Sequence, residues 1–189
     1  MELLENREAL LVKIHEQMHE KRYLHTLGVA ETAKQLAIQY GADPKKAELA
    51  GLLHDYCKCW ESSRMKELLL QHDHPEDLLD ADKSLWHSFA GAIAVQEEVG
   101  VTDEEILDAI RYHTSGRPQM TLLEKVVCLA DYIEPNRTFP GVDELRKGAE
   151  TELESTLQQA FGGTIKSLVK RNQRVYPLTI LAYNDLIQK

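Results

Sequence analysis

Apolar residues recur every three or four positions along most of the chain, which is the period of an amphipathic α-helix and not that of a β-strand. The clearest stripe runs through residues 21–40 and stops at Gly41, a residue type that commonly ends a helix. Asp43 and Pro44 then supply an N-cap and a first-turn proline for the next helix, which carries the segment AELAGLLHDYCKCW at residues 47–60. The same periodicity predicts further helices over residues 2–18, 61–71, 82–99, 103–112, 121–134, 142–148, 151–173 and 177–188.

These helices predict an all-α fold in a single domain. Thr102 and Glu105 have the spacing of a capping box for the helix over 103–112, and no stretch alternates polar and apolar residues long enough to argue for a sheet. With 189 residues, 43% of them hydrophobic, the chain is long enough for one domain with a proper core and does not require two. We expect residues 1–189 to form this one domain.

The charge balance narrows the classes of partner. The formal net charge is −9 and the pI is about 5.4, whereas sequence-independent binding of DNA or RNA needs a basic face. A small anionic substrate in a local basic pocket is still compatible with this balance. No apolar run approaches the length of a membrane span, and the N-terminal MELLENREALL is not a signal peptide. We therefore expect a cytoplasmic protein that binds neither nucleic acid nor membranes, and its three cysteines agree with a reducing compartment.

Two groups of histidines are not interpreted as metal sites. The segment HEQMH at residues 15–19 matches the zinc-protease pattern H-E-x-x-H. That pattern has only three fixed positions, and the following EKR is typical of a solvated helix end, so we predict two exposed histidines here. His72 and His74 flank Asp73 in a polar loop and are expected to be solvated. The cysteines are expected to be structural and unpaired.

Six other polar residues lie where the helical pattern would place apolar residues or helix ends. Two are carboxylates inside apolar runs, Asp55 in LLHDY and Asp131 in CLADYIEP, and burying such a charge is costly unless something compensates it. A lone buried aspartate or histidine usually has a structural role. Six such groups in one small domain are harder to explain in that way, and imidazole nitrogens with carboxylate oxygens suit iron, manganese, zinc and similar ions. The six are His25, His54, Asp55, His87, His113 and Asp131.

The adjacent pair in this set suggests more than one ion. On a helix, the side chains of His54 and Asp55 would point about 100° apart, so they cannot address one point symmetrically. A long imidazole and a short carboxylate can nevertheless converge on one ion, and the free oxygen of Asp55 could then reach a second. Six ligands are also more than one tetrahedral site needs.

The order of these residues resembles a known family. His25, His54–Asp55 and Asp131 follow the H…HD…D order of the HD-domain phosphohydrolases. The segments RYLHTLGVA, AGLLHDYCK, AIRYHTSG and LADYIEPNRTFPGVDELR resemble the YqeK-type branch of that superfamily. The resemblance runs from roughly residue 20 to the C-terminus and implies an all-α HD-domain bundle, with a core at about 20–135 and C-terminal helices at 142–188. Members of this branch hydrolyse diadenosine tetraphosphate symmetrically into two ADP molecules.

The resemblance also implies a cofactor of two divalent metal ions. Iron is the favoured metal, and manganese or another divalent ion could substitute. The segment LWHSFAGA around His87 is the loosest match to the family. One ion would be held by His25, His54, Asp55 and Asp131, and the second by Asp55, His87 and His113.

A tetraphosphate also needs positive charge. Three basic residues lie about one helical turn from a proposed ligand or shortly after one: Arg22, Lys58 and Arg137. We predict that they bind phosphate, lysine as a point charge and arginine by gripping two oxygens, and we assign Asp55, Lys58 and Arg137 to catalysis. Thr114 is predicted to contact the substrate, and both Thr114 and Glu134 are candidates to orient metal ligands.

Other residues near the predicted ligands are weaker candidates. Arg111 and Arg117 flank His113 and could also bind phosphate. An apolar or aromatic surface for adenine is expected, but the sequence does not select among the tyrosines next to the ligands. These are Tyr23, Tyr56, Tyr112 and Tyr132.

The predicted reaction is attack by water on a phosphorus within the polyphosphate bridge, with ADP as the leaving group. Two metal ions would lower the pKa of that water and neutralise phosphate oxygens. Other HD-type activities stay open as alternatives: a nucleoside monophosphatase with a one-metal site, a cyclic-nucleotide phosphodiesterase, or an alarmone hydrolase. A non-catalytic nucleotide-binding module with a structural metal is the alternative from another class. The expected partner is a small nucleotide, and a homodimer through the first or last helix is compatible with the sequence.

Overall fold

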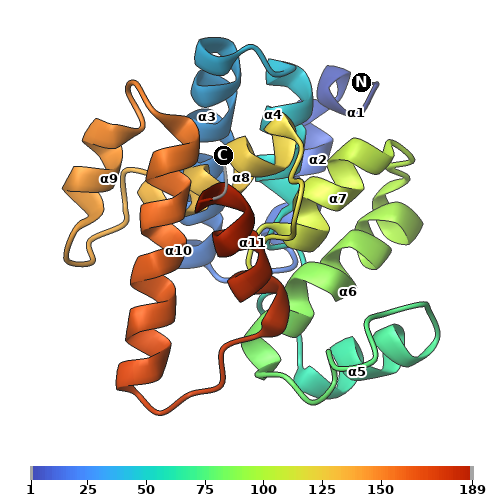
Figure 1. Cartoon of the computed structure of the whole chain (residues 1–189). Helices are drawn as coiled ribbons and strands as arrows, with labels where there is room; N and C mark the ends of the chain where they lie inside the picture. Colours follow the sequence, from blue (N-terminus) through green and yellow to red (C-terminus); the bar gives the residue numbers. More distant parts are fainter. Residues whose placement is uncertain (1, 188–189) are drawn as a thin grey trace.

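The computed structural model describes residues 2–187, and within them it contains helices and their connections without a β-strand (Figure 1). The predicted all-α fold is therefore confirmed. The α-helices are α1 (Glu2–Glu5), α2 (Arg7–His15), α3 (Glu20–Tyr40), α4 (Pro44–Leu53), α5 (Ser62–Leu70), α6 (Trp86–Ala94), α7 (Glu104–Tyr112), α8 (Leu122–Ile133), α9 (Val142–Gly148), α10 (Leu153–Lys170) and α11 (Pro177–Ile187).

Helices α3, α4 and α8 form the centre of the molecule. α3 packs along both α4 and α8, and its approach to α4 is so close that a Cβ on Gly51 would lie 2.7 Å from the Cα of Ala30. Only glycine fits such a contact between two helix backbones. The segment from Val126 to Ala130 in α8 is fully buried. These contacts bring the end of α4 next to the beginning of α3 and the end of α8.

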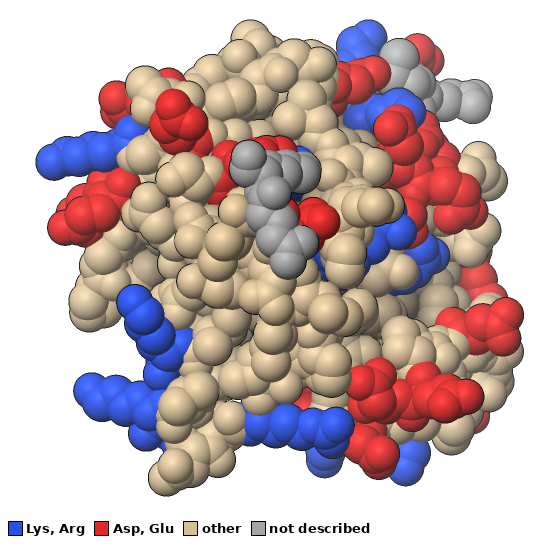
Figure 2. Space-filling model, viewed as in Figure 1, with Lys and Arg blue, Asp and Glu red and all other residues tan. Residues whose placement is uncertain are grey.

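The remaining helices cover this centre from two sides. α6 and α7 pack on each other, and α7 also contacts α4 and α8; α9 and α10 pack on α8, and α11 packs on α10 (Figure 1). Figure 2 shows charged side chains mainly around the rim of this face, whereas the surface over α10 and α11 is mostly uncharged. The buried hydrophobic residues form one cluster that runs from Leu10 to Leu186. The division into an HD core and C-terminal helices stays a prediction.

Several local signals act as predicted. Gly41 ends α3 with a φ of 85°, and Gly100 follows the helical segment before α7 with a φ of 83°. The side chain of Asp43 accepts hydrogen bonds from the backbone N–H groups of Lys45 and Lys46, at 2.8 and 3.1 Å, with Pro44 in the first turn. Each of these residues satisfies or terminates a helix end through contacts with its immediate neighbours.

Other predicted boundaries are wrong. The helix expected over 2–18 is two helices, because Asn6 leaves the helical conformation with φ −109° and ψ 52° and α2 already ends at His15. The segment expected as a helix over 82–99 is helical from Lys83 to Val99, but it consists of a 3-10 turn, α6 and a π-helical turn, Val95–Val99. The last predicted helix extended to residue 188, which lies outside the described residues.

The capping box predicted at Thr102 and Glu105 does not form. Asp103, not Thr102, is the N-cap of α7, and its carboxylate accepts from the backbone N–H of Glu105 at 3.0 Å. A capping box does form one helix later, where Thr121 and Glu124 bond to each other's backbone N–H groups. Asp103 stands immediately before the first helical residue, so its carboxylate takes the position predicted for the Thr102 hydroxyl.

Candidate metal centre

The six residues predicted as ligands come together in the middle of the bundle. His25 lies on α3, His87 on α6 and Asp131 on α8, whereas His54–Asp55 and His113 directly follow α4 and α7. They form three overlapping groups whose ligand atoms lie within 4.8 Å of one another. The prediction that α4 itself carries the His–Asp pair is wrong: α4 ends at Leu53, and His54 is its C-cap. Turn geometry after the helix aims both side chains at the same centre.

Three of the four imidazoles are oriented in the same way. The Nδ1 atoms of His54, His87 and His113 lie 2.7, 2.6 and 2.7 Å from backbone carbonyl oxygens three residues earlier. A carbonyl oxygen only accepts, so each Nδ1 must carry the proton. In a neutral imidazole this leaves a lone pair on Nε2, and in all three residues Nε2 faces the centre. Such backbone anchoring of the distal nitrogen is typical of metal-ligating histidines.

His25 is oriented by a side chain instead of a carbonyl. Its Nδ1 lies 3.0 Å from the Oε1 of Glu134, which is only 1% exposed. The other carboxylate oxygen of Glu134 accepts from the backbone N–H and the amide of Asn136, at 2.7 and 3.0 Å. A Cβ on Gly28 would lie 2.5 Å from that same oxygen, so a residue larger than glycine would displace the carboxylate. Glu134 thus fulfils the orienting role for which it was a candidate.

Asp55 lies between two pairs of histidines and presents one oxygen to each. Its Oδ2 is 3.1 Å from Nε2 of His54 and 3.6 Å from Nε2 of His25. Its Oδ1 is 3.1 Å from Nε2 of His87 and 3.8 Å from Nε2 of His113. On the first side, Oδ1 of Asp131 lies 2.9 Å from Nε2 of His25. This arrangement divides the six residues into two ligand groups that share Asp55.

The donor atoms fit a metal cation. The Nε2 atoms of His25 and His54 are buried and have no hydrogen-bond partner within the described residues, although carboxylate oxygens lie nearby. The Nε2 atoms of His87 and His113 face each other at 3.2 Å, and with both Nδ1 atoms protonated this places two lone pairs in contact. Buried polar atoms are normally satisfied, and a divalent cation between imidazole nitrogens and carboxylate oxygens satisfies all of them at once. The cluster supports the use of a divalent metal ion.

The pKa shifts of His87 and His113 agree with the neutral state. Burial lowers the pKa of His87, and burial together with the charges of His54 and His87 lowers that of His113 well below its ordinary value, so both are neutral and able to bind metal. Burial also acts to lower the pKa of His54, but the charges of Asp55 and Asp131 outweigh it and raise that pKa. Burial disfavours the charge on Asp55, but the neighbouring His54 and His87 outweigh it and hold its pKa well below the usual range. For Asp131, the effect of burial is likewise outweighed by the adjacent His25 and by the charge of Arg137, which lower its pKa.

The predicted basic residues surround this cluster. Arg22 donates to Oδ2 of Asp55 at 2.8 Å. Arg137 donates through Nε to the backbone oxygen of Asp131 at 2.7 Å and through Nη2 to its carboxylate. The Nζ of Lys58 lies 3.4 Å from both ring nitrogens of His87. The structure therefore places all three cations at the centre, each partly exposed.

Thr114 also lies at the centre, whereas the weaker arginine candidates do not join it. The hydroxyl of Thr114 is 2.9 Å from Nε2 of His113. Arg111 pairs with Asp108, and Arg117 pairs with Asp108 and with the buried Glu124. Both of these arginines therefore have structural partners on α7 and α8.

The four candidate tyrosines differ in their surroundings. The ring of Tyr23 stacks on His15, the buried Tyr56 donates to Glu98 at 3.0 Å, and Tyr112 packs edge-on against Phe89. Tyr132 lines a cavity of about 650 Å³ that also includes His113, Thr114 and Asp131. This cavity, which we call the α10 groove, therefore opens onto the metal cluster and runs along α10.

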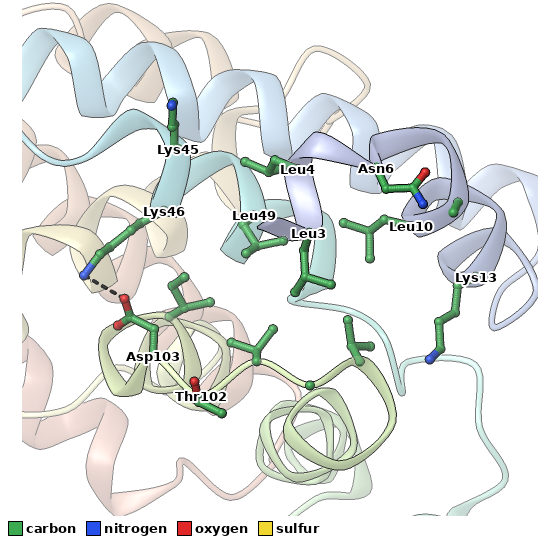
Figure 3. Close-up of a pocket in the computed structure, with 15 residues that line it drawn as sticks. Leu3, Leu4, Asn6, Leu10, Lys13, Lys45, Lys46, Leu49, Thr102 and Asp103 are labelled. Carbon is green, nitrogen blue, oxygen red and sulfur yellow. Dashed lines mark ion pairs between the residues drawn. The ribbon is translucent and has the colours of Figure 1, made fainter. Parts of the chain in front are cut away.

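A second hollow of about 510 Å³ lies at the N-terminal helices (Figure 3). It is lined by leucines such as Leu10 and Leu49 and by three lysines. One of them, Lys46, pairs with Asp103 at 2.8 Å (Figure 3) and with Glu105 at 2.6 Å. Its lining includes no histidine or cysteine among the described residues, and it shares no residue with the metal cluster.

Residues that support the ligands from a distance were not predicted from the sequence. Arg146 on α9 donates to the backbone oxygens of Ile133, Glu134 and Arg137, at 3.0, 2.8 and 2.8 Å. It thereby holds the turn after α8 that carries both Glu134 and Arg137. No pattern in the sequence connects this arginine to a turn about ten residues earlier, since its partners are backbone atoms. The part of the α10 groove beyond Tyr132 and Arg137, which includes Phe139 and Gly163, was also not predicted.

Comparison with known proteins agrees with this geometry. The HD domain family model matches residues 22–136, close to the core predicted at about 20–135. The chain is 55% identical over 182 residues to a Bacillus subtilis (strain 168) protein, covering 96% of this chain and 98% of that one. It is 43% identical to a Staphylococcus aureus protein, covering 89% and 88% of the two chains. Both relatives are named "Bis(5'-nucleosyl)-tetraphosphatase, symmetrical".

A solved structure resembles the whole fold. A Clostridium acetobutylicum protein, described as a "predicted HD superfamily hydrolase involved in NAD metabolism", superposes with a TM-score of 0.92 at 39% sequence identity. The match covers 96% of this chain and 97% of that one. In the part of this chain that the structure describes, no helix is both long and apolar enough to cross a membrane.

Proposed function

This chain belongs to the HD domain family, and we propose that it is a hydrolase that cleaves dinucleoside tetraphosphates symmetrically, producing two ADP molecules from diadenosine tetraphosphate. Relatives at 43–55% identity that carry this activity in their names cover most of the chain. The substrate is therefore a small nucleotide. Free cysteines persist in reducing compartments, which supports a cytoplasmic location.

The observation that carries the proposal is the two-sided position of Asp55. Its two oxygens face two pairs of buried imidazoles, at 3.1 Å from His54 and 3.1 Å from His87. A one-metal site would need only the first side. The second side supports a centre for two divalent ions bridged by Asp55, with iron as the proposed metal. Bound there, the ions would lower the pKa of a water and neutralise phosphate oxygens during in-line attack.

The protein's own residues then have distinct tasks. The carbonyls of Gly51 in α4 and Ile110 in α7 and the carboxylate of Glu134 fix the imidazole tautomers, so that no proton occupies the inward nitrogens. Lys58 lies beside His87 and Arg137 beside Asp131, so the two cations stand next to different ligand groups of the cluster. From there they can hold the phosphates on either side of the reacting phosphorus. Their positive charges would also stabilise the negative charge that develops on the departing ADP. Arg22 and Thr114 complete the substrate contacts in this proposal.

The other activities considered from the sequence use less of this site. A nucleoside monophosphatase would leave His87 and His113 without a purpose, although both are 2% exposed and aimed at the cluster. A non-catalytic binding module would not need four imidazoles aimed at one cluster, two of which, His25 and His54, have inward nitrogens without a hydrogen-bond partner among the described residues. No feature of the described residues favours a cyclic nucleotide or an alarmone over a dinucleotide.

The test is product analysis with defined metal content. Protein loaded anaerobically with iron or manganese would be incubated with diadenosine tetraphosphate, and the products separated by ion-exchange chromatography. ADP as the sole product is the expected result. ATP with AMP would show that a different bond is attacked, and tight binding without turnover would overturn the enzymatic proposal. Light scattering of the same sample would test the proposed homodimer.

A further inference from the structure

The α10 groove starts at the metal cluster and continues well beyond it. One wall is α10, and the other is the segment from Arg137 to Leu145 that leads from α8 into α9. Three of its α10 residues, and the C-cap residue that follows the helix, are spaced four apart, as expected of one face of a helix, which makes a continuous wall about 18 Å long at 1.5 Å per residue. They are Gln159, Gly163, Ser167 and Arg171.

Gly163 is the unusual residue of this wall. It lies in the interior of an 18-residue helix, where glycine is less favourable than any residue except proline. A Cβ built on Gly163 meets no other atom within 4 Å, whereas one on the neighbouring Gly162 would lie 3.3 Å from Tyr183. Protein packing therefore does not require a glycine at position 163. A glycine that leaves backbone bare next to a cavity is typical of a place where a ligand approaches closely.

The opposite wall carries an exposed aromatic ring. The side chain of Phe139 is 38% exposed and lines the groove together with Pro140 and Leu145. Tyr132 lines the inner end, where its hydroxyl bonds with that of Thr164 at 2.8 Å. Exposed aromatic rings stack on nucleobases, because every base presents a π-face. Phe139 and Gly163 line the same groove, so a base stacked on this ring would lie in the cavity that the bare backbone of α10 borders.

The charges of the groove are ordered along its length. Arg137 stands at the metal end, bonded to Asp131, and Arg171 lies one residue past the C-terminal end of α10. Figure 2 shows basic side chains around that lower end of α10. Between the two arginines the lining is apolar or uncharged apart from Glu144, whose carboxylate is an acceptor for the hydroxyls of a ribose or the amino group of a base.

We propose that the α10 groove binds one purine nucleoside of the substrate, with the base against Gly163 and Phe139 and the phosphate chain passing Arg137 to the metal cluster. The volume of about 650 Å³ lies within the range of pockets that enclose a single small ligand. The inference rests on the proposed function, because it assumes that the cluster acts on a nucleotide. It adds which part of the chain recognises the nucleoside.

The experiment compares ADP with inorganic pyrophosphate as ligands of the metal-loaded protein, measured by isothermal titration calorimetry. Gly163→Leu fills the groove with a good helix former, and Phe139→Ala removes the ring while Phe139→Trp retains a stacking surface. Val169→Leu is the matched control, because Val169 is exposed on α10 but does not line the groove. Metal content and melting temperature are measured for each variant.

The expected result separates the nucleoside from the phosphates. Gly163→Leu and Phe139→Ala should weaken ADP binding roughly tenfold or more, the scale of losing one stacked base, with unchanged pyrophosphate binding and metal content. Gly163→Leu should also raise the melting temperature, since it removes a helical glycine. Phe139→Trp and Val169→Leu should bind ADP like the wild type.

Two results would overturn the inference. One is equal ADP affinity in Gly163→Leu, Phe139→Ala and the wild type, and the other is a loss of pyrophosphate binding that matches the loss of ADP binding. Failure of the proposed function looks different: the wild type would then give no ADP from diadenosine tetraphosphate. If the wild type does give ADP while Gly163→Leu has an unchanged KM, only the groove inference fails.

Discussion

The histidines of the N-terminal segment and those at the centre of the bundle have different roles. In the N-terminal segment, His15 is exposed, pairs with Glu20 at 2.9 Å and stacks on Tyr23, while the ring of His19 caps α3 by accepting from the backbone N–H of Arg22. In the centre of the bundle, the Nε2 atoms of His25 and His54 are buried without a hydrogen-bond partner within the described residues.

The difference teaches that the surroundings of the ring nitrogens, and not the sequence motif, identify a metal ligand. The N-terminal pair matches a known zinc-binding pattern but turns toward solvent and toward its own chain. The central histidines match no short motif as a set, since they come from four different segments. Yet each has its outer nitrogen tied to a fixed acceptor and its inner nitrogen aimed at the cluster.

The strongest test of this comparison is Asp55→Ala, which removes the residue shared by both ligand groups. We expect the protein to lose bound metal and to lose activity by roughly 10³-fold or more, at least the effect of removing one transition-state stabilising group. The fold should survive, because the helix core does not depend on this carboxylate. Metal analysis, turnover of diadenosine tetraphosphate and far-UV circular dichroism would check this. Full activity in this variant would refute the assignment of the centre.

His87→Ala breaks only one side of the centre. The other side, with His25, His54 and Asp131, is left intact, so we expect the metal content to fall from two ions to one per chain. Activity should fall by more than about 10²-fold, above the 10- to 100-fold range for residues that only orient a metal ligand. Quantitative metal analysis of the purified variant would check the stoichiometry. An unchanged ratio of two would show that His87 is not a ligand.

Adding metal should stabilise the central region and leave the N-terminal one unaffected. A divalent ion that binds only the folded protein adds about 2.7 kcal/mol to the free energy of unfolding at a hundred times its Kd. For a chain of this size that corresponds to a rise in melting temperature of about 5–10 °C. Differential scanning calorimetry with iron or manganese would measure it, and a chelator should reverse it. Asp55→Ala is the control that should show no rise, whereas His15→Ala should show the wild-type rise.

Glu134→Gln tests a residue that orients the ligand His25 but is not itself a predicted metal ligand. The amide keeps the shape of the carboxylate but loses its charge, and one of its two ends becomes a donor facing the donors of Asn136. We expect metal affinity to fall by roughly 10- to 100-fold, the usual effect of altering a residue that orients a histidine ligand. Metal titration would check this. Wild-type affinity would show that His25 does not need Glu134 for its orientation.

The smallest effect is expected from His19→Ala. The variant loses the cap of α3, so the free energy of unfolding should fall by about 1 kcal/mol or less. Metal content and activity should equal those of the wild type, because this ring faces solvent. Chemical denaturation and the tetraphosphatase assay would measure both quantities. Loss of metal from this variant would revive the interpretation of HEQMH as a ligand pair.

Much of this protein was determined by its sequence alone. The helical period gives the all-α fold, and residues such as Gly41 and Asp43 end or start helices through contacts within a few positions. Six polar residues in apolar surroundings predicted the cluster, and the structure brings all six together. The errors were local as well: the break at Asn6 and the capping by Asp103 depend on backbone conformations that side-chain periodicity does not report.

Only the tertiary structure decided how these residues act on one another. His25 meets Glu134 across 109 positions of the chain, and Asp55 reaches four histidines because α3, α4, α6 and α7 end or pass at the same point. The α10 groove exists because α9 and α10 pack on α8 and leave a space beside the cluster. Helix ends and the helical period depend on residues a few positions apart, so the sequence determines them. The direction of an imidazole nitrogen depends on how helices from the whole domain pack together, so only the tertiary structure determines it.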